Sequence, residues 1–580
     1  MIVVEEELDS GLSNFRLFTG YFCLLWYFCI LVAAYSGFFE ILFNFRTRPI
    51  LYKHKDVDNQ QQQEEIDEEN EFYEGVTILR PIKGIDPELY SCLESSFLQN
   101  YPLDKLQILF CIDDESDPSI PIIKKLLSKY PHIDANILIN DESDPSISII
   151  KKLLSKYPHI DANILISENY NSINKFSDDH YGPNPKVNNL SKGFLAAKYD
   201  ILWIMDSNVW ASSNILKNSV ITLNKNLNMN RKMGNYRPVK LVHHVPLAVS
   251  IGNLNHNNDI VDLENMELTP TYSSSDESKC ESESSGLTNR KTPSPRRVSI
   301  HESNDDSKLF KKLGANLDEM FLHTSHAKFY VSLNNLAIAP CVNGKSNMYR
   351  RSDLDQSVKL IPYKNSQFFK DTKVKQDAGY YTSLGIGHAI KFFARYIGED
   401  NMIGIALWEN CQGRTGLTGD VVVQPLSSTQ NNSVNDYIQR RVRWLRVRKY
   451  MVLLATLIEP TTESLICGLY GTYAISTVFF NGAWFNTSWF LFHMLIWIIT
   501  DYVQYYTLIN HSLDNSNINY IPTWLQGIPS KNYNFFKWFY IWLIREFLAL
   551  PIWIIAMIGH EIDWRGKPFV IKKDLTAEEL

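Results

Sequence analysis

The sequence predicts an α/β fold in which a doubly wound, mostly parallel sheet lies between apolar segments at the two ends of the chain. Two observations carry this prediction. Segments typical of buried strands alternate with segments typical of helices, and such alternation produces parallel sheets covered by helices. Apolar runs near both ends are long enough to cross a bilayer, so we expect a membrane protein. The net charge of −7 argues against a nucleic-acid partner.

The first apolar run, Leu17–Phe43, has no small-residue cleavage site, which favours a permanent anchor over a removed signal peptide. Acidic residues precede it between positions 5 and 9, and basic residues follow it between positions 46 and 55. Because positively charged flanks stay in the cytosol, we expect a lumenal N-terminus (1–16), a transmembrane anchor (17–45) and a cytosolic domain after it.

Two stretches have the composition of disordered segments. Residues 46–71 begin basic and become acidic and glutamine-rich, and residues 253–311 are rich in serine, aspartate and glutamate. So few apolar side chains cannot offset the chain entropy lost on folding. We therefore expect a linker at 46–71 and a disordered insert at 253–311 inside the main domain, 72–460.

The eight cysteines form neither a CxxC pair nor a metal-binding spacing, which favours a reduced, cytosolic setting.

Between these stretches, apolar runs and amphipathic runs follow one another in the order that a parallel sheet requires. The predicted strands are apolar along most of their length, as in sheets whose two faces are both covered by helices. In such sheets, ligands bind at the carboxyl ends of the strands. The predicted strands are Val76–Pro81, Leu106–Ile112, Ala135–Ile139 and Tyr199–Ser207, and the predicted helices include Tyr90–Asn100 and Pro121–Tyr130.

A duplicated block, 114–166, interrupts this alternation. The segment Asp114–Ile139 returns as Asp141–Ile166 with a single substitution. Each copy contains a loop, a helix and a strand, so either strand can complete the sheet, and two units are too few for a solenoid. The first copy follows a buried strand directly and has an aspartate before it, whereas the second copy has Asn140 there. We therefore favour Asp114 as the working residue.

Carboxylates stand where the predicted strands end. Asp113 and Asp114 follow the strand Leu106–Ile112, and Asp206 follows the run ILWIM. A single aspartate after a strand is often a turn residue or the N-cap of the next helix. Several aspartates at one edge of a sheet favour a ligand site instead.

Two further features lie later in the chain. Glu399 and Asp400 begin a helical pattern, where acidic residues also serve to complement the helix dipole. The basic run Gln439–Lys449 precedes the last apolar segments, and such a run also binds anionic lipid headgroups. Headgroup binding needs positive charge but no tryptophan at a fixed place, and this run contains Trp444.

The C-terminal part, 461–562, contains three apolar runs. Leu465–Phe485 and Trp489–Tyr506 predict a membrane hairpin with a very short turn. Phe535–Ile558 is interrupted by charged residues and a proline, so it is either a tilted span or an interfacial helix. Three spans would place the tail, 563–580, in the lumen, whereas its basic residues favour the cytosol.

Taken together, these elements resemble a processive-type, inverting nucleotide-sugar glycosyltransferase. Its pattern is three separated aspartates followed by (Q/R)xxRW beside membrane helices, and the matching positions are Asp114, Asp206, Asp400 and Arg440-x-x-Arg443-Trp444. The segments ILRPIKGIDPELYSCLESSF, NPKVNNLSKGFLAAKYDILWIMDS, CVNGKS and IGEDNMIGIAL narrow the resemblance to the ceramide glucosyltransferase family. It covers most of the chain outside the two acidic inserts and the extra repeat copy.

That resemblance implies a GT-A-like fold for the domain at 72–460 and transfer of glucose from UDP-glucose to the primary hydroxyl of ceramide, with inversion. Asp400 would be the catalytic base, and Asp114 would hold the uridine or ribose. Asp206 would hold Mg²⁺ or Mn²⁺ on the diphosphate, as a divalent ion commonly binds one or two carboxylates plus phosphates. Relatives with a metal usually carry D-x-D there, whereas this chain has Asn208 in the second position.

The resemblance also implies roles for basic and aromatic residues. Arg440 and Arg443 would stabilise the departing diphosphate, and Trp444 would form an apolar wall for the acceptor. Lys186 and His243 would contact the donor. The competing interpretations are that Lys186 is a solvated loop lysine and that His243 is a structural histidine whose hydrogen bonds are satisfied within the protein.

The lipid acceptor explains why a cytosolic domain would be anchored at both ends, because ceramide stays in the bilayer and presents its hydroxyl at the surface. The resemblance implies an integral membrane protein of the Golgi or endoplasmic reticulum, with its catalytic domain facing the cytosol. Three other functions fit parts of the sequence. They are a processive polysaccharide synthase using a UDP-sugar, a catalytically silent membrane scaffold, and a headgroup-binding module based on the basic run alone.

Overall fold

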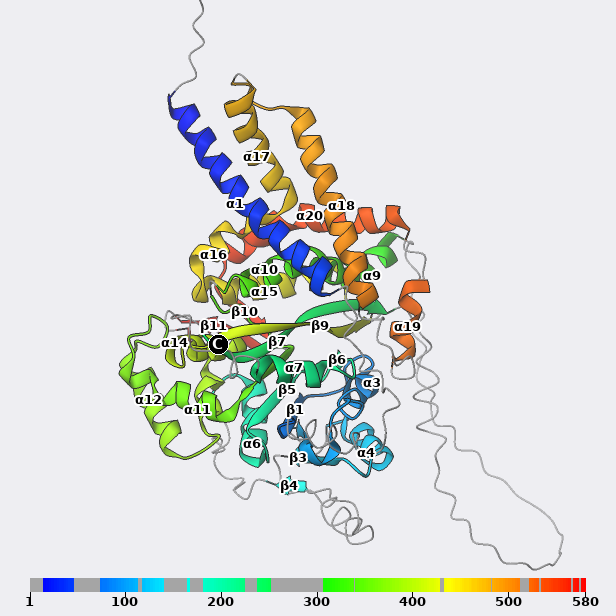
Figure 1. The fold of residues 1–580 in the computed structure, drawn as a ribbon, viewed down its shortest axis with the longest axis vertical. Coiled ribbons are helices and arrows are strands. Elements are labelled where there is room, and N and C mark those ends of the chain that lie inside the picture. The colour runs from blue at the N-terminus through cyan, green and yellow to red at the C-terminus, as the bar shows by residue number, and fades with distance from the viewer. Residues whose placement is uncertain are drawn as a thin grey trace, which may run out of the picture.

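A computed structural model gives the fold of the chain, with three upright helices at one end and a sheet covered by helices at the other (Figure 1). The structure describes residues 14–45, 73–112, 117–139, 164–166, 181–224, 237–251, 306–337, 339–427, 432–480, 482–511, 521–530, 534–564, 567–572 and 575–580.

The main sheet has nine strands in the order β4-β3-β2-β1-β5-β8-β7-β9-β6. Strands β4 to β5 of this order are all parallel, β7 pairs β9 in parallel, and β8 and β6 pair their neighbours antiparallel. The prediction of a mostly parallel sheet is therefore confirmed. The bounds are β1 Val76–Ile82, β2 Leu106–Ile112, β3 Asp134–Ile139, β4 Ile164–Ile166, β5 Ile201–Met205, β6 Trp210–Ala211, β7 Val239–Ile251, β8 Ser346–Arg350 and β9 Arg414–Ser427.

The sheet is buried on both faces, as its continuous apolar strands require. Every residue of β1 and β2 is buried. Alternate side chains enter different cores, so Ile78 packs in the cluster on one face and Leu79 in the cluster on the other. The covering helices are α3 Leu89–Glu94, α4 Ile120–Lys129, α6 Pro185–Ala196, α7 Ile215–Asn224, α11 Arg351–Lys359, α12 Thr372–Ser383, α13 Ala389–Phe392 and α14 Glu399–Asn410.

One of these helices is shorter than predicted. The pattern Tyr90–Asn100 predicted a helix to position 100, but α3 ends at Glu94. The hydroxyls of Ser95 and Ser96 instead accept hydrogen bonds from the buried guanidinium of Arg80, at 3.2 and 2.9 Å. Serine competes with helical backbone in this way, and the sequence pattern gave no sign of Arg80 as its partner.

The two copies of the duplicated block lie side by side in the sheet. Strand β3 of the first copy pairs in parallel with β4 of the second, so that Ile137, Leu138 and Ile139 face their own repeats, Ile164, Leu165 and Ile166. The first copy's strand also pairs with β2, whereas β4 occupies the edge of the sheet. Both strands therefore enter the sheet, with the first copy nearer its centre.

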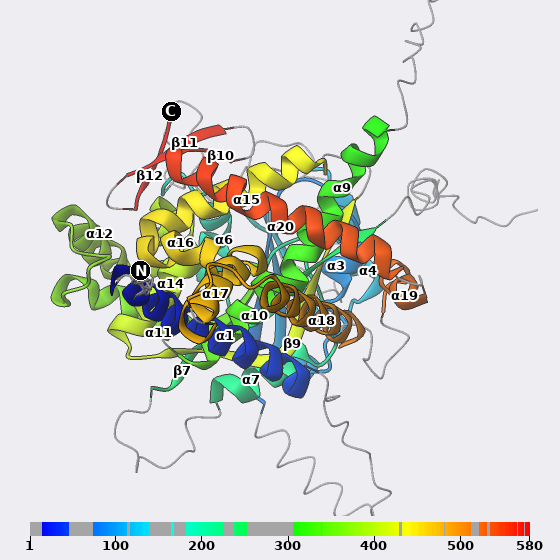
Figure 2. The ribbon, with the colours of Figure 1, turned by 90° about the horizontal axis from the view of Figure 1, so that it is seen from above.

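The apolar segments form α1 (Asn14–Asn44), α17 (Ser464–Phe479), α18 (Thr487–His511) and α20 (Phe535–Ile558). By length and composition, α1 and α20 could each cross a membrane, and α17 is a shorter apolar helix. Figure 1 shows α1, α17 and α18 upright, with α20 running across their direction near the lower end of α17, and Figure 2 shows the three upright helices close together. Of the two interpretations of this last run, the arrangement favours the interfacial helix.

A helical layer that the sequence did not predict connects the upright helices to the sheet. It consists of α9 (Asp306–Phe321), a π-helical turn (Leu322–His326) and α10 (Ala327–Asn335). The predicted disordered insert, 253–311, is wrong at its end, because α9 begins at Asp306 with an amphipathic pattern. Its remainder lies outside the described residues. Gln504 of α18 donates to the carbonyls of His323 and Thr324 in the π turn, at 2.6 and 2.8 Å, which ties this layer to α18.

The basic run forms α15, and the tail folds against it. The tail predicted at 563–580 belongs to a three-stranded sheet, β10 to β12. Lys449 donates to the carbonyl of Gly559 at 2.7 Å, next to the C-terminus of α20, where positive charge complements the helix dipole. The remaining bounds are α15 Val434–Met451, α16 Leu453–Ile458, a 3-10 turn at Glu459–Thr462, α19 Thr523–Ser530, β10 Glu561–Trp564, β11 Lys567–Ile571 and β12 Ala577–Glu579.

Candidate donor and acceptor site

Three of the predicted site residues come together where β5, α6 and α14 meet. The Nζ of Lys186 lies 2.9 Å from Oδ1 of Asp206 and 3.1 Å from Oε1 of Glu399. Asp400 is the next residue on α14, and its Oδ2 would lie 3.2 Å from a Cβ placed on Gly344. The same Cβ would lie 3.2 Å from Lys186 Nζ, so Asp400 and Lys186 flank one point.

Local sequence explains why Lys186 is held at this place. Asn184 caps α6, because its Oδ1 accepts from the backbone N–H groups of Lys186 and Val187 at 3.0 and 3.3 Å. Pro185 fills the first helical position, where no backbone donor is needed. The Nδ2 of Asn184 donates to Oε2 of Glu399 at 2.8 Å, which fixes the start of α14 against α6.

A loop before β8 completes the cluster with a second lysine. The Nζ of Lys345 lies 3.1 Å from Oδ2 of Asp206, and the backbone N–H of Asp206 donates to the Lys345 carbonyl at 3.1 Å. Lys186 donates to the carbonyl of Gly344 at 2.9 Å. Glycine at 344 leaves the space that the side chains of Lys186 and Asp400 occupy.

The charges around this point shift two carboxyl pKa values in opposite directions. Burial alone would raise the pKa of Asp206, but Lys186 and Lys345 lower it to about 2. Burial and the neighbouring Glu399 raise the pKa of Asp400 to about 7, against the opposing effect of Lys186. Asp206 is therefore a fixed anion, and Asp400 can exchange a proton near neutral pH.

His243 is fully buried in β7, where its Nδ1 hydrogen-bonds the hydroxyl of Tyr330. Burial and the adjacent His244 lower its pKa to about 3, so the imidazole is neutral. The Tyr330 hydroxyl also accepts from the backbone N–H of Asn343 at 3.2 Å. Through Tyr330, His243 thus supports the loop that contains Gly344. A direct contact between His243 and the donor stays a prediction.

The predicted arginines lie on α15 and make other ion pairs. Arg440 pairs with Asp318 of α9. Arg443 contributes to the positive field at the same carboxylate, whose pKa burial raises to about 6 although the arginines oppose this. The ring of Trp444 lies 6.5 Å from that of Phe321, against α9. None of these described contacts reaches Asp206, so the diphosphate role of the arginines stays a prediction.

Helix α15 nevertheless passes beside the start of α14. A Cβ on Gly398 would lie 3.3 Å from Val447 and 3.2 Å from the sulfur of Met451. Gly398 is two residues before Asp400, so the C-terminal half of α15 forms one wall of the catalytic region. Asp114 and Asp141 both lie outside the described residues.

The sequence reading missed Glu399, Lys345, Asn184 and Tyr330 as members of this site. Signals for two of them were present. The pair Asn184-Pro185 is an N-cap followed by proline at the first helical position, and it marks the helix that presents Lys186. Glu399 adjoins Asp400. Nothing in the sequence signals Tyr330, which reaches the site from the unpredicted helix α10.

The described residues do not by themselves fit a divalent metal. No group of three or more His, Cys, Asp or Glu side chains is arranged within them so that it could hold a metal ion. Asp206 has both carboxylate oxygens paired with lysine ammonium groups, and Asn208 Oδ1 accepts from Lys345 at 3.2 Å. The positive charge next to Asp206 in the described site comes from these two ammonium groups.

Comparison with known proteins places this geometry in a family. The model of glycosyl transferase family 21 matches residues 42–143, 138–256 and 386–577, more than half of the chain. The chain is similar to the ceramide glucosyltransferase of Candida albicans, at 69% identity over the full length of both proteins. It is 43% identical to that of Komagataella phaffii over 96% of this chain and 91% of the relative.

Among solved structures, a mannosyltransferase from Pyrobaculum calidifontis in complex with GDP-mannose and Mn²⁺ is 11% identical. The alignment covers 94% of this chain and 98% of that one, with a TM-score of 0.29. The family match and the mixed parallel sheet identify the fold as GT-A-like. The chain therefore belongs to glycosyl transferase family 21, among the ceramide glucosyltransferases.

Proposed function

We propose that this membrane-associated glycosyltransferase transfers glucose from UDP-glucose to the primary hydroxyl of ceramide, with inversion, at the cytosolic face. The observation that carries the proposal is Asp400 beside the Lys186–Asp206 pair, with its pKa raised to about 7. A group with this pKa accepts a proton efficiently at neutral pH, as base catalysis of an attacking hydroxyl requires.

The reaction would proceed as one displacement. The primary hydroxyl oxygen of ceramide attacks the anomeric carbon of glucose and forms the new C–O bond, while its proton passes to an Oδ atom of Asp400. The bond between the anomeric carbon and the diphosphate oxygen breaks, and UDP departs with its electron pair from the opposite face. Attack and departure on opposite faces invert the anomeric centre, which gives β-glucosylceramide.

Lys186 and Lys345 are placed to favour departure of UDP. Negative charge grows on the diphosphate as its bond breaks, and fixed cations in a partly buried site stabilise such charge. Both ammonium groups are held by Asp206, which keeps them in position before the donor binds. Asp114, which follows β2 in the sequence and lies outside the described residues, remains our candidate for the uridine or ribose contact.

Mg²⁺ or Mn²⁺ on the diphosphate remains part of the proposal. Asp206 would be its ligand, although that carboxylate already pairs with two lysines, and a bound ion would have to displace one of them. When bound, such an ion would neutralise diphosphate charge.

The membrane arrangement suits a lipid acceptor. If α1, α17 and α18 cross the bilayer, α20 runs across their direction near the lower end of α17, as a helix along the bilayer surface would (Figure 1). Asp400 is then on the cytosolic side, given the positive flank that follows α1. The Golgi or endoplasmic reticulum is the membrane we propose.

The test uses the purified full-length chain in detergent. UDP-glucose and ceramide should give glucosylceramide by mass, with a β linkage by NMR, and one UDP for each product. Omitting ceramide should abolish consumption of UDP-glucose. Polymer formed without ceramide would contradict the proposal and favour the polysaccharide synthase, and a chain that binds UDP-glucose without forming product would favour the silent scaffold.

A further inference from the structure

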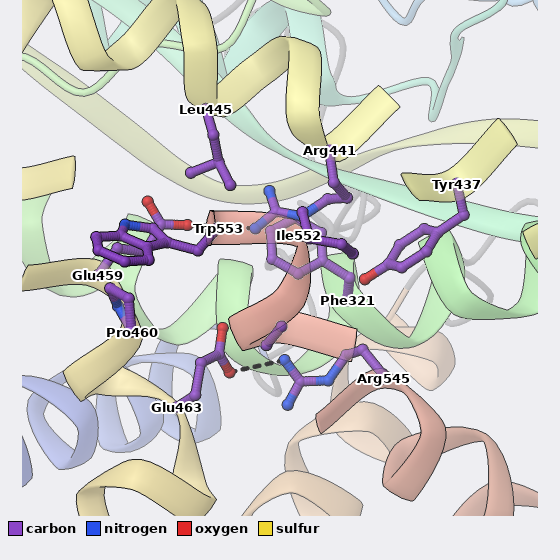
Figure 3. Close-up of a pocket in the computed structure, with 11 residues that line it drawn as sticks. Phe321, Tyr437, Arg441, Leu445, Glu459, Pro460, Glu463, Arg545, Ile552 and Trp553 are labelled. Carbon is purple, nitrogen blue, oxygen red and sulfur yellow. Dashed lines mark hydrogen bonds and ion pairs between the residues drawn. The ribbon is translucent and has the colours of Figure 1, made fainter. Parts of the chain in front are cut away.

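Two arginine side chains among the described residues are almost wholly buried, and they differ in their partners. Arg80 of β1 is 0% exposed, and Arg545 of α20 is 1% exposed. Arg545 lies 2.8 Å from a carboxylate oxygen of Glu463, as Figure 3 shows. The five N–H groups of Arg80 instead bond to neutral oxygens. Burying a charge without a paired counter-charge costs stability, and such exceptions are typical of functional sites.

The Nη1 group of Arg80 closes the turn that follows β5. It donates to the carbonyl oxygen of Asp206 at 2.8 Å and to that of Val209 at 2.9 Å. The backbone N–H of Val209 donates to the same Asp206 carbonyl at 3.2 Å, so these two residues are the ends of a four-residue turn. Arg80 reaches the turn because its neighbour Leu79 pairs with Ile204 across β1 and β5, two residues before Asp206.

The side chains of this turn make the contacts of the proposed donor site. Oδ2 of Asp206 and Oδ1 of Asn208 both contact Nζ of Lys345, at 3.1 and 3.2 Å. The hydroxyl of Ser207 donates to Oδ2 of Asp86, in the loop after β1, at 2.7 Å. The conformation of the turn therefore sets the position of the carboxylate that holds the lysines of the site.

The other nitrogens of Arg80 are anchored at the end of α3. Nη2 donates to the carbonyl of Cys92 at 2.7 Å and to the hydroxyl of Ser95 at 3.2 Å, and Nε donates to the hydroxyl of Ser96 at 2.9 Å. Because a guanidinium group is planar and rigid, these three bonds fix the direction in which Nη1 points. Arg80 therefore joins the end of α3 to the turn after β5.

The charge of Arg80 also acts beyond these contacts. Burial lowers the pKa of Arg80 to about 10, against the opposing effects of Cys92 and Asp206, so the guanidinium stays charged at neutral pH. Asp206 bonds to Arg80 through its backbone carbonyl, while its carboxylate contacts the lysines. Water and salt screen a buried charge weakly, so the field of Arg80 extends to the groups around the turn.

We propose that Arg80 is a positioning residue for the donor. It holds the turn 206–209 in the conformation that presents Asp206 to the lysines, and its buried charge favours the diphosphate of a nucleoside diphosphate sugar beside that turn. The inference rests on the proposed function, whose donor site it extends. Arg80 acts through the turn and through its field, so substitutions should change donor affinity and leave the KM for ceramide unchanged.

Two variants of Arg80 in the full-length protein separate this role from a purely structural one. The probe is UDP, and its Kd is measured by calorimetry. Arg80→Gln removes the charge and should raise the Kd about tenfold or more. Arg80→Lys keeps the charge, and one ammonium group can bond to both carbonyls of the turn, so the Kd should stay within about threefold. Both variants should lower the thermal midpoint, because acceptors at the end of α3 lose their donors.

Arg350 provides the matched control at the opposite end of the strands. It pairs with Ile201 at the start of β5, and its Nη2 lies 2.7 Å from Oε1 of Glu74. Arg350→Gln should lower the thermal midpoint and leave the Kd for UDP unchanged. The inference is wrong if Arg80→Gln binds UDP as tightly as Arg350→Gln, or if Arg80→Lys loses as much affinity as Arg80→Gln.

If Arg80→Gln does not fold, hydrogen–deuterium exchange of the unaltered protein decides. The backbone N–H of Val209 lies in the turn that Arg80 holds, so it should exchange slowly before any UDP is added. Exchange as fast as in an unstructured peptide, slowed only after UDP binds, would overturn the inference.

The two proposals fail in different ways. If the unaltered protein makes glucosylceramide while Arg80→Gln binds UDP normally, the positioning role is wrong and the function stands. If Arg80→Gln loses affinity for UDP while the unaltered protein forms no glucosylceramide from UDP-glucose, the positioning role stands and the transfer reaction is wrong.

Discussion

Two clusters of basic side chains lie near the predicted site, and they differ in what their charges meet. Lys186 and Lys345 converge on Asp206, in a cluster that shifts the pKa values of two carboxyl groups. Arg440 pairs with Asp318 of α9, away from that cluster. The sequence analysis assigned Lys186 to the donor and the arginines to the departing diphosphate, and it did not identify Lys345. The structure shows a preorganised site in the first and a helix-to-helix brace in the second.

Among the substitutions that distinguish the roles of the two clusters, removal of the Lys186 charge should lower kcat/KM the most. Lys186→Met would leave Asp206, Glu399 and Asp400 together without their shared cation and would remove a fixed positive charge beside the departing diphosphate, so kcat/KM should fall by about a hundredfold or more. Steady-state kinetics with UDP-glucose would measure it. A variant with near-normal kcat/KM would show that Lys186 holds the cluster together without contributing to the reaction.

Crowding the same cluster should have a smaller effect. Gly344→Ala adds a methyl group 3.2 Å from Asp400 Oδ2 and Lys186 Nζ, which must move apart. Small displacements of a catalytic group lower kcat between about tenfold and a hundredfold. Gly379→Ala is the control, because a Cβ there meets nothing within 4 Å. Equal activity of the two variants would mean that Asp400 does not act from the position described.

The pH dependence of the reaction should follow Asp400. Its raised pKa means that the carboxyl is protonated below about pH 7 and cannot accept the acceptor's proton. The value of kcat/KM should therefore fall about tenfold for each pH unit below that point and level off above it. Asp206, with its pKa near 2, should not contribute in this range. A profile that stays flat down to pH 5 would contradict the raised pKa.

The brace on α15 should affect stability more than chemistry. Arg440→Gln and Asp318→Asn should each lower the thermal midpoint, with a coupling energy of about 0.5–3 kcal/mol in the double variant. If the arginine acts only as a brace, kcat should change little in Arg440→Gln. A large loss of kcat that Asp318→Asn does not share would instead support the predicted contact with the diphosphate.

The sequence predicts the centre of the sheet well because buried strands carry their own signal. The run LQILFCI is apolar apart from Gln107, and β2 has the predicted bounds, Leu106–Ile112. Asp206 was singled out by its place at the end of a strand, whereas Asp400, at the start of a helix, was assigned to the site only by resemblance. Lys186 was predicted by resemblance, and the Asn184-Pro185 cap explains its position.

The missed parts depend on contacts between distant segments. Tyr330 reaches Asn343 from a helix that follows a long polar insert, and its importance appears only when α10 packs under α1. Serine-rich composition hid the start of α9, and short polar strands hid the tail sheet. Pairing of this kind is set by tertiary packing, which local propensity does not encode.

The most direct test of the account is the product yield of Asp400→Asn beside the unaltered protein. The amide keeps the shape of the side chain but cannot accept the proton, so product formation should fall about a hundredfold or more while UDP-glucose still binds. Asp104→Asn, an exposed aspartate outside the site, should retain activity. Asp400→Asn with full activity would contradict the central claim that this carboxylate is the base.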